Sequence, residues 1–390
     1  MDVLNIAWTI IQILTGYHLV FPGLLYLLWK LIGTKQSAEA EQPVEIDYAI
    51  VVTAYQYTNT LPDVVRSILD LNYSNYMVYI VADNCDVTDL NFNSEKVILL
   101  RPTEVLGANT KSHDYAIKNF IRAHQVVTII DSDNLLDPEY LNQMSLSFNN
   151  GYQAVQGLRA AKNLNGTIAC LDAARDMYYH FYDGKLLFEV GSSATLAGSG
   201  MAFKTTLYQD FLTNNQVSGA GFDKVLQSWL VSRKIRIAFN ESAVVYDEKT
   251  SKTEQLVHQR SRWINTWFKY AGLGVTMTFL GLKNFNRNQF LFGFVLLRPP
   301  LFIFLILSVL CFGVNIGVGN LPGILSWFVA FVLFVLFFLV SLVSSKADKR
   351  IYKSLLNIPK FVFYQLISLL KIRKANKISV ATRHYNNTDK

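Results

Sequence analysis

Two aspartates stand one residue apart at the end of an apolar run in the stretch VVTIIDSDNLLD, Val126–Asp137. The run VVTII has the length and β-branched side chains of a buried strand, so Asp131 and Asp133 would lie at its carboxyl end. Neighbouring carboxylates repel each other unless a cation or a donor compensates them. The spacing therefore predicts a site for Mg²⁺ or Mn²⁺ that holds a diphosphate. The alternative is an aspartate that closes a turn or caps the next helix.

The elements around this pair predict an α/β domain. Strand-like and helix-like segments alternate along the chain: DYAIVVT, LPDVVRSILDL, VYIVAD, KVILL, TKSHDYAIKNFIRA and VVTII. This order favours a mostly parallel sheet with helices on both faces. Ligands of such sheets bind beyond the carboxyl ends of the strands. Asp83 ends VYIVAD, so it is expected to face the same crevice as Asp131 and Asp133.

Two common phosphate-binding fingerprints are missing from the sequence. The stretch GANTKS at 107–112 lacks the spacing of a Walker loop, and the pattern G-x-G-x-x-G does not occur. The sequence therefore shows no Walker loop, and the missing dinucleotide fingerprint argues against a Rossmann dehydrogenase.

A second motif, HQRSRW at His258–Trp263, comes shortly before a long apolar region. Together with Asp83, the Asp131-Ser132-Asp133 triplet and Asp223, it resembles the membrane-bound family 2 glycosyltransferases. These include cellulose, chitin and hyaluronan synthases and ceramide glucosyltransferase. The resemblance covers about 48–270, and the ordered set D, D-x-D, D and Q-x-x-R-W is specific although each member is weak. It implies a GT-A fold, a nucleotide-sugar-binding α/β domain with a mostly parallel central sheet, together with transmembrane helices.

The resemblance also assigns residues to the donor side of the site. Asp83 matches the aspartate that contacts the nucleotide base, and Lys111 stands where the family has a basic residue ahead of a similar helix. Asp131 and Asp133 match the pair that holds the ribose and the metal-diphosphate. Arg262 matches the arginine that would stabilise the leaving diphosphate, a task suited to a planar guanidinium.

On the acceptor side, the resemblance marks a small-residue loop and two residues of HQRSRW: Gly198, Ser199, Gly200, Gln259 and Trp263. Asp223, in GFDKVLQSWL, falls where the family has its catalytic aspartate. A carboxylate in that place can take the proton of an attacking hydroxyl. Attack by the acceptor in a single displacement would invert the anomeric centre. Trp263 offers an apolar face for a sugar ring.

Other interpretations of these residues stay open. Asp223 could serve only as an acidic residue at a helix N-terminus. Trp263 and Trp267 could form a core or interface stripe, and Arg260 and Arg262 could face lipid headgroups. The lone histidines are expected to be structural or surface residues.

The chain departs from the family pattern at two places. TAYQYTNT stands where many relatives have a P-x-Y-N-E-E-like stretch, and Gly221-Phe222 replaces the first two residues of T-E-D. These departures affect donor identity and acceptor geometry rather than the reaction class.

The composition indicates a membrane protein. Hydrophobic residues make up 51% and charged residues 17% of 390 residues, and the formal charge is +7. The basic residues flank apolar runs, which fits a cytoplasmic membrane face better than a nucleic-acid partner. The three cysteines are far apart and predict neither a disulfide framework nor a zinc site.

The N-terminal apolar run predicts a retained anchor. Val3–Trp29 contains no Asp, Glu, Lys or Arg and is long enough to cross the bilayer. A cleaved signal peptide fits poorly, because the run is long and no positive charge precedes it. Lys30 and Lys35 follow it, so the positive-inside rule places the next domain in the cytoplasm.

A helical hairpin is expected near the C-terminus. Leu301–Val318 and Ile324–Val343 are apolar, Asn320, Pro322 and Gly323 would form the turn between them, and both outer flanks are basic. Phe290–Leu297 is expected to be interfacial or re-entrant, with a further span as the alternative. Ile351–Ile372 is interpreted as an amphipathic helix on the membrane surface, with a soluble helix packed on the catalytic domain as the alternative.

The expected organisation has six parts, which are a transmembrane anchor (1–32), a GT-A catalytic domain (46–270), interfacial segments (271–298), a transmembrane hairpin (299–345), an amphipathic interfacial helix (350–373) and a polar tail (374–390).

The sequence therefore predicts a multi-pass, metal-dependent inverting glycosyltransferase. Its donor would be a nucleotide-sugar, with a UDP-sugar expected, and its acceptor a lipid-linked intermediate or a glycan at the cytoplasmic face of a plasma or inner membrane. Because the predicted spans are few, a lipid-linked acceptor is favoured, and a processive polysaccharide synthase is the alternative. A transporter is disfavoured because the spans carry almost no charge. An inactive nucleotide-sugar scaffold is disfavoured because every carboxylate expected for catalysis is present.

Overall fold

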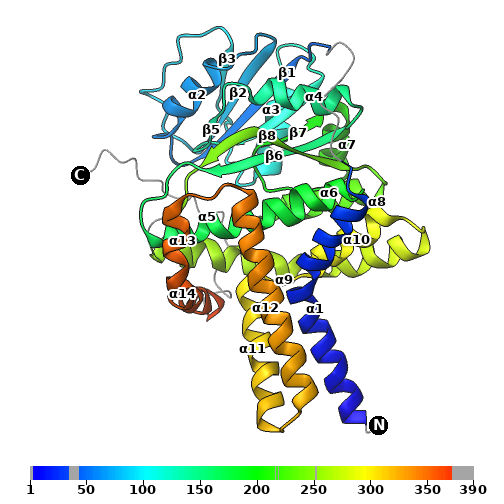
Figure 1. The fold of residues 1–390 in the computed structure, drawn as a ribbon. Helices are drawn as coiled ribbons and strands as arrows, with labels where there is room; N and C mark the ends of the chain where they lie inside the picture. Colours follow the sequence, from blue (N-terminus) through cyan, green and yellow to red (C-terminus); the bar gives the residue numbers. More distant parts are fainter. Residues whose placement is uncertain (1–2, 35–43, 216, 218, 251–252, 371–390) are drawn as a thin grey trace.

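The computed structural model describes residues 3–34, 44–215, 217, 219–250 and 253–370, and the predicted linker (36–42) and polar tail lie outside them. Its centre is an eight-stranded sheet in the order β3-β2-β1-β4-β7-β6-β8-β5 (Figure 1). The strands are β1 (Tyr48–Tyr55), β2 (Tyr76–Asp83), β3 (Val97–Leu100), β4 (Val126–Asp131), β5 (Leu135–Leu136), β6 (Ala154–Ala161), β7 (Met201–Lys204) and β8 (Ile237–Asp247).

The sheet is mostly parallel, as predicted. β3, β2, β1 and β4 run parallel to one another, and β6 runs parallel to β8. β7 is antiparallel to both β4 and β6, so β6 and β8 point the same way as β4. The carboxyl ends of six strands therefore lie along one edge. Continuous apolar strands such as β2, buried at every position, are what a sheet covered on both faces requires.

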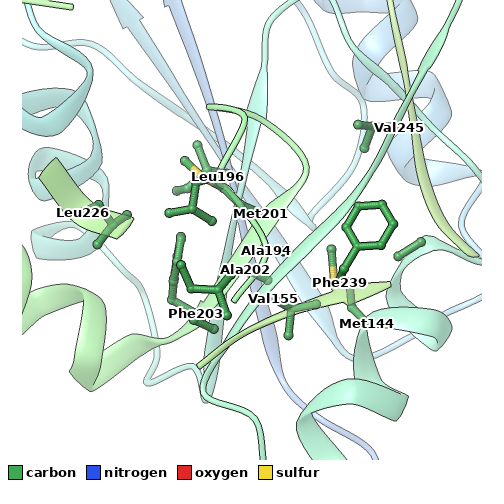
Figure 2. Packing of buried hydrophobic residues seen from close by; sticks show 14 of the residues in the cluster. Met144, Val155, Ala194, Leu196, Met201, Ala202, Phe203, Leu226, Phe239 and Val245 are labelled. Atoms are coloured by element: carbon green, nitrogen blue, oxygen red, sulfur yellow. The ribbon is translucent and has the colours of Figure 1, made fainter. Parts of the chain in front are cut away.

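Helices cover both faces of this sheet. Tyr48 and Thr128 point to one face, where their hydroxyls reach Ser145 and Tyr140 of α4 (Tyr140–Asn149). Tyr79 points to the other face, where its hydroxyl meets His124 just beyond α3 (Asn109–Lys118). Figure 2 shows part of the core, in which Val155, Met201 and Phe203 pack with side chains from the surrounding elements.

The remaining elements of this domain are α2 (Leu61–Leu69), α5 (Thr167–Tyr179), a π-helix η1 (His180–Leu186), α6 (Leu187–Glu189), α7 (Thr205–Asn214), α8 (Phe222–Ser232) and α9 (Thr253–Lys283).

Two helices are long and apolar enough to cross a membrane within the part of the chain that is described. They are α1 (Val3–Ile32) and α12 (Leu321–Ser344). α10 (Arg287–Leu297) and α11 (Leu301–Gly317) form a pair bent by 74°, which would make a third span. In Figure 1, α1, α11 and α12 project together from one side of the sheet domain. Gln12 joins all three helices, because its side-chain oxygen accepts hydrogen bonds from Asn315 and Trp327.

The hairpin turn is tighter than predicted. Asn320, Pro322 and Gly323 were expected to form it, but α12 begins at Leu321 and includes Pro322 in its first turn. Proline is compatible with the first helical turn, because the backbone N–H that it lacks has no acceptor there. The side chain of Asn320 caps the helix instead by accepting the N–H of Gly323.

The predicted amphipathic helix is broken in two. α13 (Lys349–Ser354) and α14 (Ile358–Leu370) are separated by a 3₁₀ turn, η2 (Leu355–Asn357). Pro359 sits in the first turn of α14, and a continuous helix would not tolerate it. Ile351 of α13 packs on α5, while α14 contacts α9 through the hydrogen bond from Ser261 to the carbonyl of Ser368. Both helices thus rest on the sheet domain.

One buried histidine of the sheet domain predicts a pH dependence of stability. His113 of α3 is fully buried, and burial lowers its pKa to about 3. Its Nδ1 hydrogen-bonds the Tyr208 hydroxyl of α7 at 2.7 Å. Unfolded histidine takes up a proton near pH 6.5, so the stabilisation is present above pH 6.5 and is lost as the pH falls toward 3.

We expect the free energy of unfolding to fall by roughly 2 kcal/mol between pH 6.5 and 5 through this group. Thermal unfolding of the detergent-solubilised chain at both pH values measures the loss. His113→Gln keeps a polar partner for Tyr208 but does not titrate, so its melting temperature should vary less with pH. An unchanged slope in this variant would contradict the assignment.

Candidate active site

Three predicted site residues lie at or just beyond the carboxyl-end edge of the sheet: Asp83, Asp131 and Asp133, which follows β4 by two residues. Asp83 ends β2 and is paired in register with Tyr55 of β1, and Asp131 ends β4 and is paired with Thr53 of β1. β2 and β4 both flank β1, so the Cα atoms of Asp83 and Asp131 lie roughly 12 Å apart, from two strand spacings and a two-residue offset. This distance suits the two ends of one nucleotide.

Asp83 also organises the loop above it. Its side chain is buried, and its two carboxylate oxygens accept the backbone N–H groups of Leu106 and Gly107 at 2.9 and 2.8 Å. Gly107 adopts a φ of +64°, which favours glycine. Lys111 follows in the first turn of α3, where its side chain is exposed. Lys111 therefore lies on the helix that directly follows this loop in the chain.

The loop that carries Asp131 and Asp133 is held by side chains from two distant loops, one before β7 and one before α2. The N–H of Asp131 donates to the Ser199 hydroxyl at 3.0 Å, and that hydroxyl donates to Asn134 at 2.6 Å. Thr60 donates its hydroxyl hydrogen to the carbonyl of Ser132. Asp133 is buried, whereas Asp131 is partly exposed. The predicted small-residue loop and the aspartate pair are therefore in direct contact.

The flanking glycines explain why this small-residue loop can approach so closely. Gly198 and Gly200 have φ values of +87° and +65°. A Cβ at Gly200 would lie 2.7 Å from a methyl carbon of Val245. A larger residue at position 200 would clash with Val245, so glycine is needed there for Ser199 to reach the amide of Asp131.

The donor set suits a cation that brings most of its ligands with it. No group of three or more His, Cys, Asp and Glu side chains converges in the described residues. Asp131 and Asp133 together offer two carboxylates on one loop. Magnesium-type ions are commonly held by one or two carboxylates plus substrate phosphates and water. The residues therefore fit an ion that arrives with a diphosphate.

Asp223 opens α8 next to the helix that carries HQRSRW. Gly221, just before α8, has a φ of +97°, and a Cβ there would lie 2.4 Å from the Thr266 methyl and 2.8 Å from the Tyr270 ring. One turn after Asp223, Gln227 accepts the N–H of Leu196 at 2.9 Å. The N-terminal part of α8, from Gly221 to Gln227, thus touches both α9 and the segment that leads into the Ser199 loop.

On α9, Gln259, Arg262, Thr266 and Tyr270 follow one another at three- and four-residue spacing and form one stripe. At its C-terminal end, Thr266 and Tyr270 lie against Gly221. At its N-terminal end, Gln259 accepts a hydrogen bond from the hydroxyl of Thr250 at 3.4 Å. Burial lowers the pKa of Arg262. The Thr266–Tyr270 end of this stripe therefore lies against Gly221, two residues before Asp223.

Trp263 and Arg260 have different environments. Trp263 is 42% exposed, and the guanidinium groups of Arg260 and Arg175 lie 4.0 and 4.6 Å from its ring. Arg260 is buried and pairs with Asp172 of α5. The interpretation of Arg260 as a residue that faces lipid headgroups is therefore wrong.

Several polar residues of the site were not predicted. Asn134 donates to Asp247 of β8 at 3.1 Å, and Asp247 also pairs with Arg159 of β6 and with Lys249. Arg159 and Asp247 are at or near the carboxyl ends of parallel strands, so the rule that found Asp83 would have found them. The missing step was recognising β6 and β8 as strands.

The charges of this cluster stabilise one another. Burial would raise the pKa of Asp247, but Arg159 and Lys249 outweigh it and hold that pKa well below its usual range. Burial would lower the pKa of Arg159, but Asp247 and then Asp131 raise it. A positive charge therefore stands beside the aspartate pair.

Comparison with known proteins shows the family of the chain. The family model described as "Glycosyltransferase like family 2" matches residues 45–266, and the chain belongs to this family. The nucleotide-sugar transferase class and the GT-A-like sheet therefore agree with the fold described above. A search among curated proteins found no match.

Two solved structures illustrate the likeness. A mannosyltransferase, PcManGT from Pyrobaculum calidifontis, in complex with GDP-Man and Mn²⁺, is 13% identical with a TM-score of 0.59. The match covers 94% of this chain and 99% of that one. S. aureus TarS 1–349 in complex with UDP-GlcNAc is 13% identical with a TM-score of 0.41, over 85% and 90% of the two chains. The first of these likenesses supports the shared fold across both the sheet domain and the flanking helices.

Proposed function

We propose that the chain is a membrane-bound inverting glycosyltransferase that moves a sugar from a nucleotide donor to a lipid-linked or glycan acceptor. The observation that carries this proposal is the contact of the aspartate-pair loop with the Ser199 loop, whose preceding segment is joined at Leu196 to Gln227, one turn after Asp223 on α8. These contacts link the segments that carry the residues matched to donor, acceptor and catalytic roles, and this linkage supports the proposal.

The donor would lie along the carboxyl ends of β2, β1 and β4. Asp83 would face the base, and Lys111 would add positive charge near the nucleotide. A divalent cation, when bound, would be held by Asp131 and Asp133 and would compensate the charge of the diphosphate. Arg262 would bind the diphosphate with its planar guanidinium.

Asp223 would act as the base of the reaction. It would take the proton of the acceptor hydroxyl while that oxygen attacks the anomeric carbon and the bond to the diphosphate oxygen breaks. The nucleoside diphosphate leaves, and the anomeric configuration inverts. Gly198, Ser199, Gly200, Gln259 and Trp263 would contact the acceptor, with the half-exposed Trp263 ring available to a sugar face.

The acceptor is expected to come from the membrane side. α9 and α10 lie across the direction of α1, α11 and α12, between those helices and the sheet (Figure 1). Large apolar side chains of this region are exposed, with Phe279, Leu282 and Phe285 at 65%, 59% and 98%. Such a surface suits the headgroup boundary of a bilayer, with the sheet domain in the cytoplasm. An acceptor anchored in lipid would then reach the site without leaving the membrane.

The deciding experiment is a donor screen on membranes that contain the full chain. UDP-glucose, UDP-N-acetylglucosamine and GDP-mannose would each be supplied with Mg²⁺ or Mn²⁺, and the products analysed by mass spectrometry. One sugar added per acceptor, with an inverted anomeric centre, supports the proposal. A ladder of products would instead indicate a processive polysaccharide synthase. The absence of transfer from every donor, while membranes with a known glycosyltransferase remain active, would refute the proposal.

A further inference from the structure

Next to the loop of the aspartate pair lies a cluster of buried or nearly buried charged side chains from β6, β8, the loop that follows β8, α5 and α9. Its members come from segments far apart in the chain: Arg159, Asp172, Arg175, Asp176, Asp247, Lys249 and Arg260. Burying so many charges is costly unless each is paired in good geometry. The ion pairs of this cluster form two groups, called here the two halves, and Lys249 takes part in both.

The first half supports the donor loop. The amide of Asp131 is held by Ser199, Ser199 by Asn134, and Asn134 by Asp247. Asp247 is fixed by Arg159, whose Nη2 lies 2.8 Å from its Oδ1. Arg159 is itself anchored, because its Nη1 donates to the carbonyl of Ala197 at 2.6 Å.

The second half supports the HQRSRW helix. On α5, Arg175 pairs with Asp176 and, at 3.1 Å, with Asp172. Asp172 in turn pairs with Arg260 of α9. Arg175 and Arg260 also stack against Trp263. The position of this part of α9 therefore depends on the carboxylates of α5.

Lys249 is the connection between the halves. Its Nζ lies 2.7 Å from Oδ2 of Asp247 and 2.5 Å from Oδ2 of Asp176, and the residue is 2% exposed. Burial would lower the pKa of Lys249, but Asp176 and Asp247 hold it above its usual value, so the side chain is charged.

Lys249 is not needed to neutralise the cluster. Asp247 has Arg159, Asp176 has Arg175, and Asp172 has Arg260. Each carboxylate thus keeps an arginine when the lysine is removed. Lys249 is a buried fourth cation that bridges two carboxylates, each of which already has an arginine partner. Its presence is best explained by the connection that it makes between α5 and β8.

We propose that Lys249 is a positioning residue, which sets the HQRSRW helix relative to the Asp131–Asp133 loop through Asp176 and Asp247. This inference rests on the proposed glycosyl transfer. Gln259, Arg262 and Trp263 must meet a sugar and diphosphate that the other loop holds. Misplacement by about 1 Å can cost ~100-fold in rate even when all reacting groups are present.

Lys249→Met tests the proposal, because it keeps the length of the side chain and removes the charge. The assay uses full-length protein in membranes and the donor that the wild type turns over. We expect kcat to fall by ~100-fold, with the Kd of the matching nucleoside diphosphate and Mn²⁺ changed by less than about threefold, since the donor half keeps Arg159. We also expect more donor to be hydrolysed per sugar transferred, as water replaces a misplaced acceptor.

Three further variants make the result specific. Lys249→Arg should recover part of the lost rate, because it restores the positive charge. Asp176→Asn cuts the same connection from the α5 side and should show the same split between kcat and Kd, which covers the case in which Lys249→Met does not fold. Lys185→Met removes another ion-paired lysine, bound to Glu241 at 2.7 Å, and should leave kcat unchanged.

The proposal is wrong if Lys249→Met and Asp176→Asn retain the wild-type kcat, or if kcat and nucleotide affinity fall together. Failure of the proposed function would show differently, as a wild-type chain that transfers no sugar from any donor.

Discussion

Asp223→Asn is expected to bind the nucleotide donor as well as the wild type does and to lose sugar transfer by about 10²–10⁴-fold, the usual contribution of a positioned general base. Asparagine has nearly the same shape but cannot take a proton from the acceptor hydroxyl. Transfer is measured by mass spectrometry of the product in membranes, and donor binding by calorimetry with nucleoside diphosphate and Mn²⁺. A loss confined to kcat would place Asp223 at the chemical step.

The matched control addresses the other role open to Asp223. Its place in the first turn of α8 lets it stabilise the helix dipole, which contributes about 0.3–1 kcal/mol. Asp63 occupies the first turn of α2, where its side chain is exposed and pairs with Arg66. Asp63→Asn should therefore cost a similar amount of stability and leave transfer unchanged. Normal turnover by Asp223→Asn would remove Asp223 from the mechanism.

Asp131→Asn and Asp133→Asn should each reduce transfer by at least ~100-fold, since charge compensation at a diphosphate is worth several kcal/mol. Unlike Asp223→Asn, these variants should also bind nucleoside diphosphate more weakly and need more Mn²⁺ for half-maximal binding. A titration of Mn²⁺ at fixed nucleotide, followed by calorimetry, measures both effects.

Asp137→Asn is the control for this pair, because Asp137 lies in the same stretch but accepts hydrogen bonds from the Tyr246 hydroxyl and the Glu139 amide. It should cost about 1 kcal/mol of stability, as a typical lost hydrogen bond does, and keep the wild-type rate. If Asp133→Asn showed the metal requirement of the wild type, the cation site would have to lie elsewhere.

Much of the fold was predictable because its signals are local. Each predicted strand from DYAIVVT to VVTII forms within about two residues of its expected bounds, since a short apolar run between turn residues is recognised without knowing its neighbours. The carboxyl-end rule then placed Asp83 and Asp131 at one edge. The break between α13 and α14 was missed, although Pro359 was a local signal for it.

By itself, the sequence determined which residue types stand at the strand ends, which segments are apolar enough for a membrane, and the family to which the ordered motifs point. Only the tertiary structure decided how these motifs are connected. Asn134 meets Asp247 across 113 positions, and Asp172 meets Arg260 across 88. No periodicity encodes such pairs, because their energy arises only when folding buries the charges together. The role of Lys249, which lies in no recognised motif, became visible only once both of its carboxylates were in place.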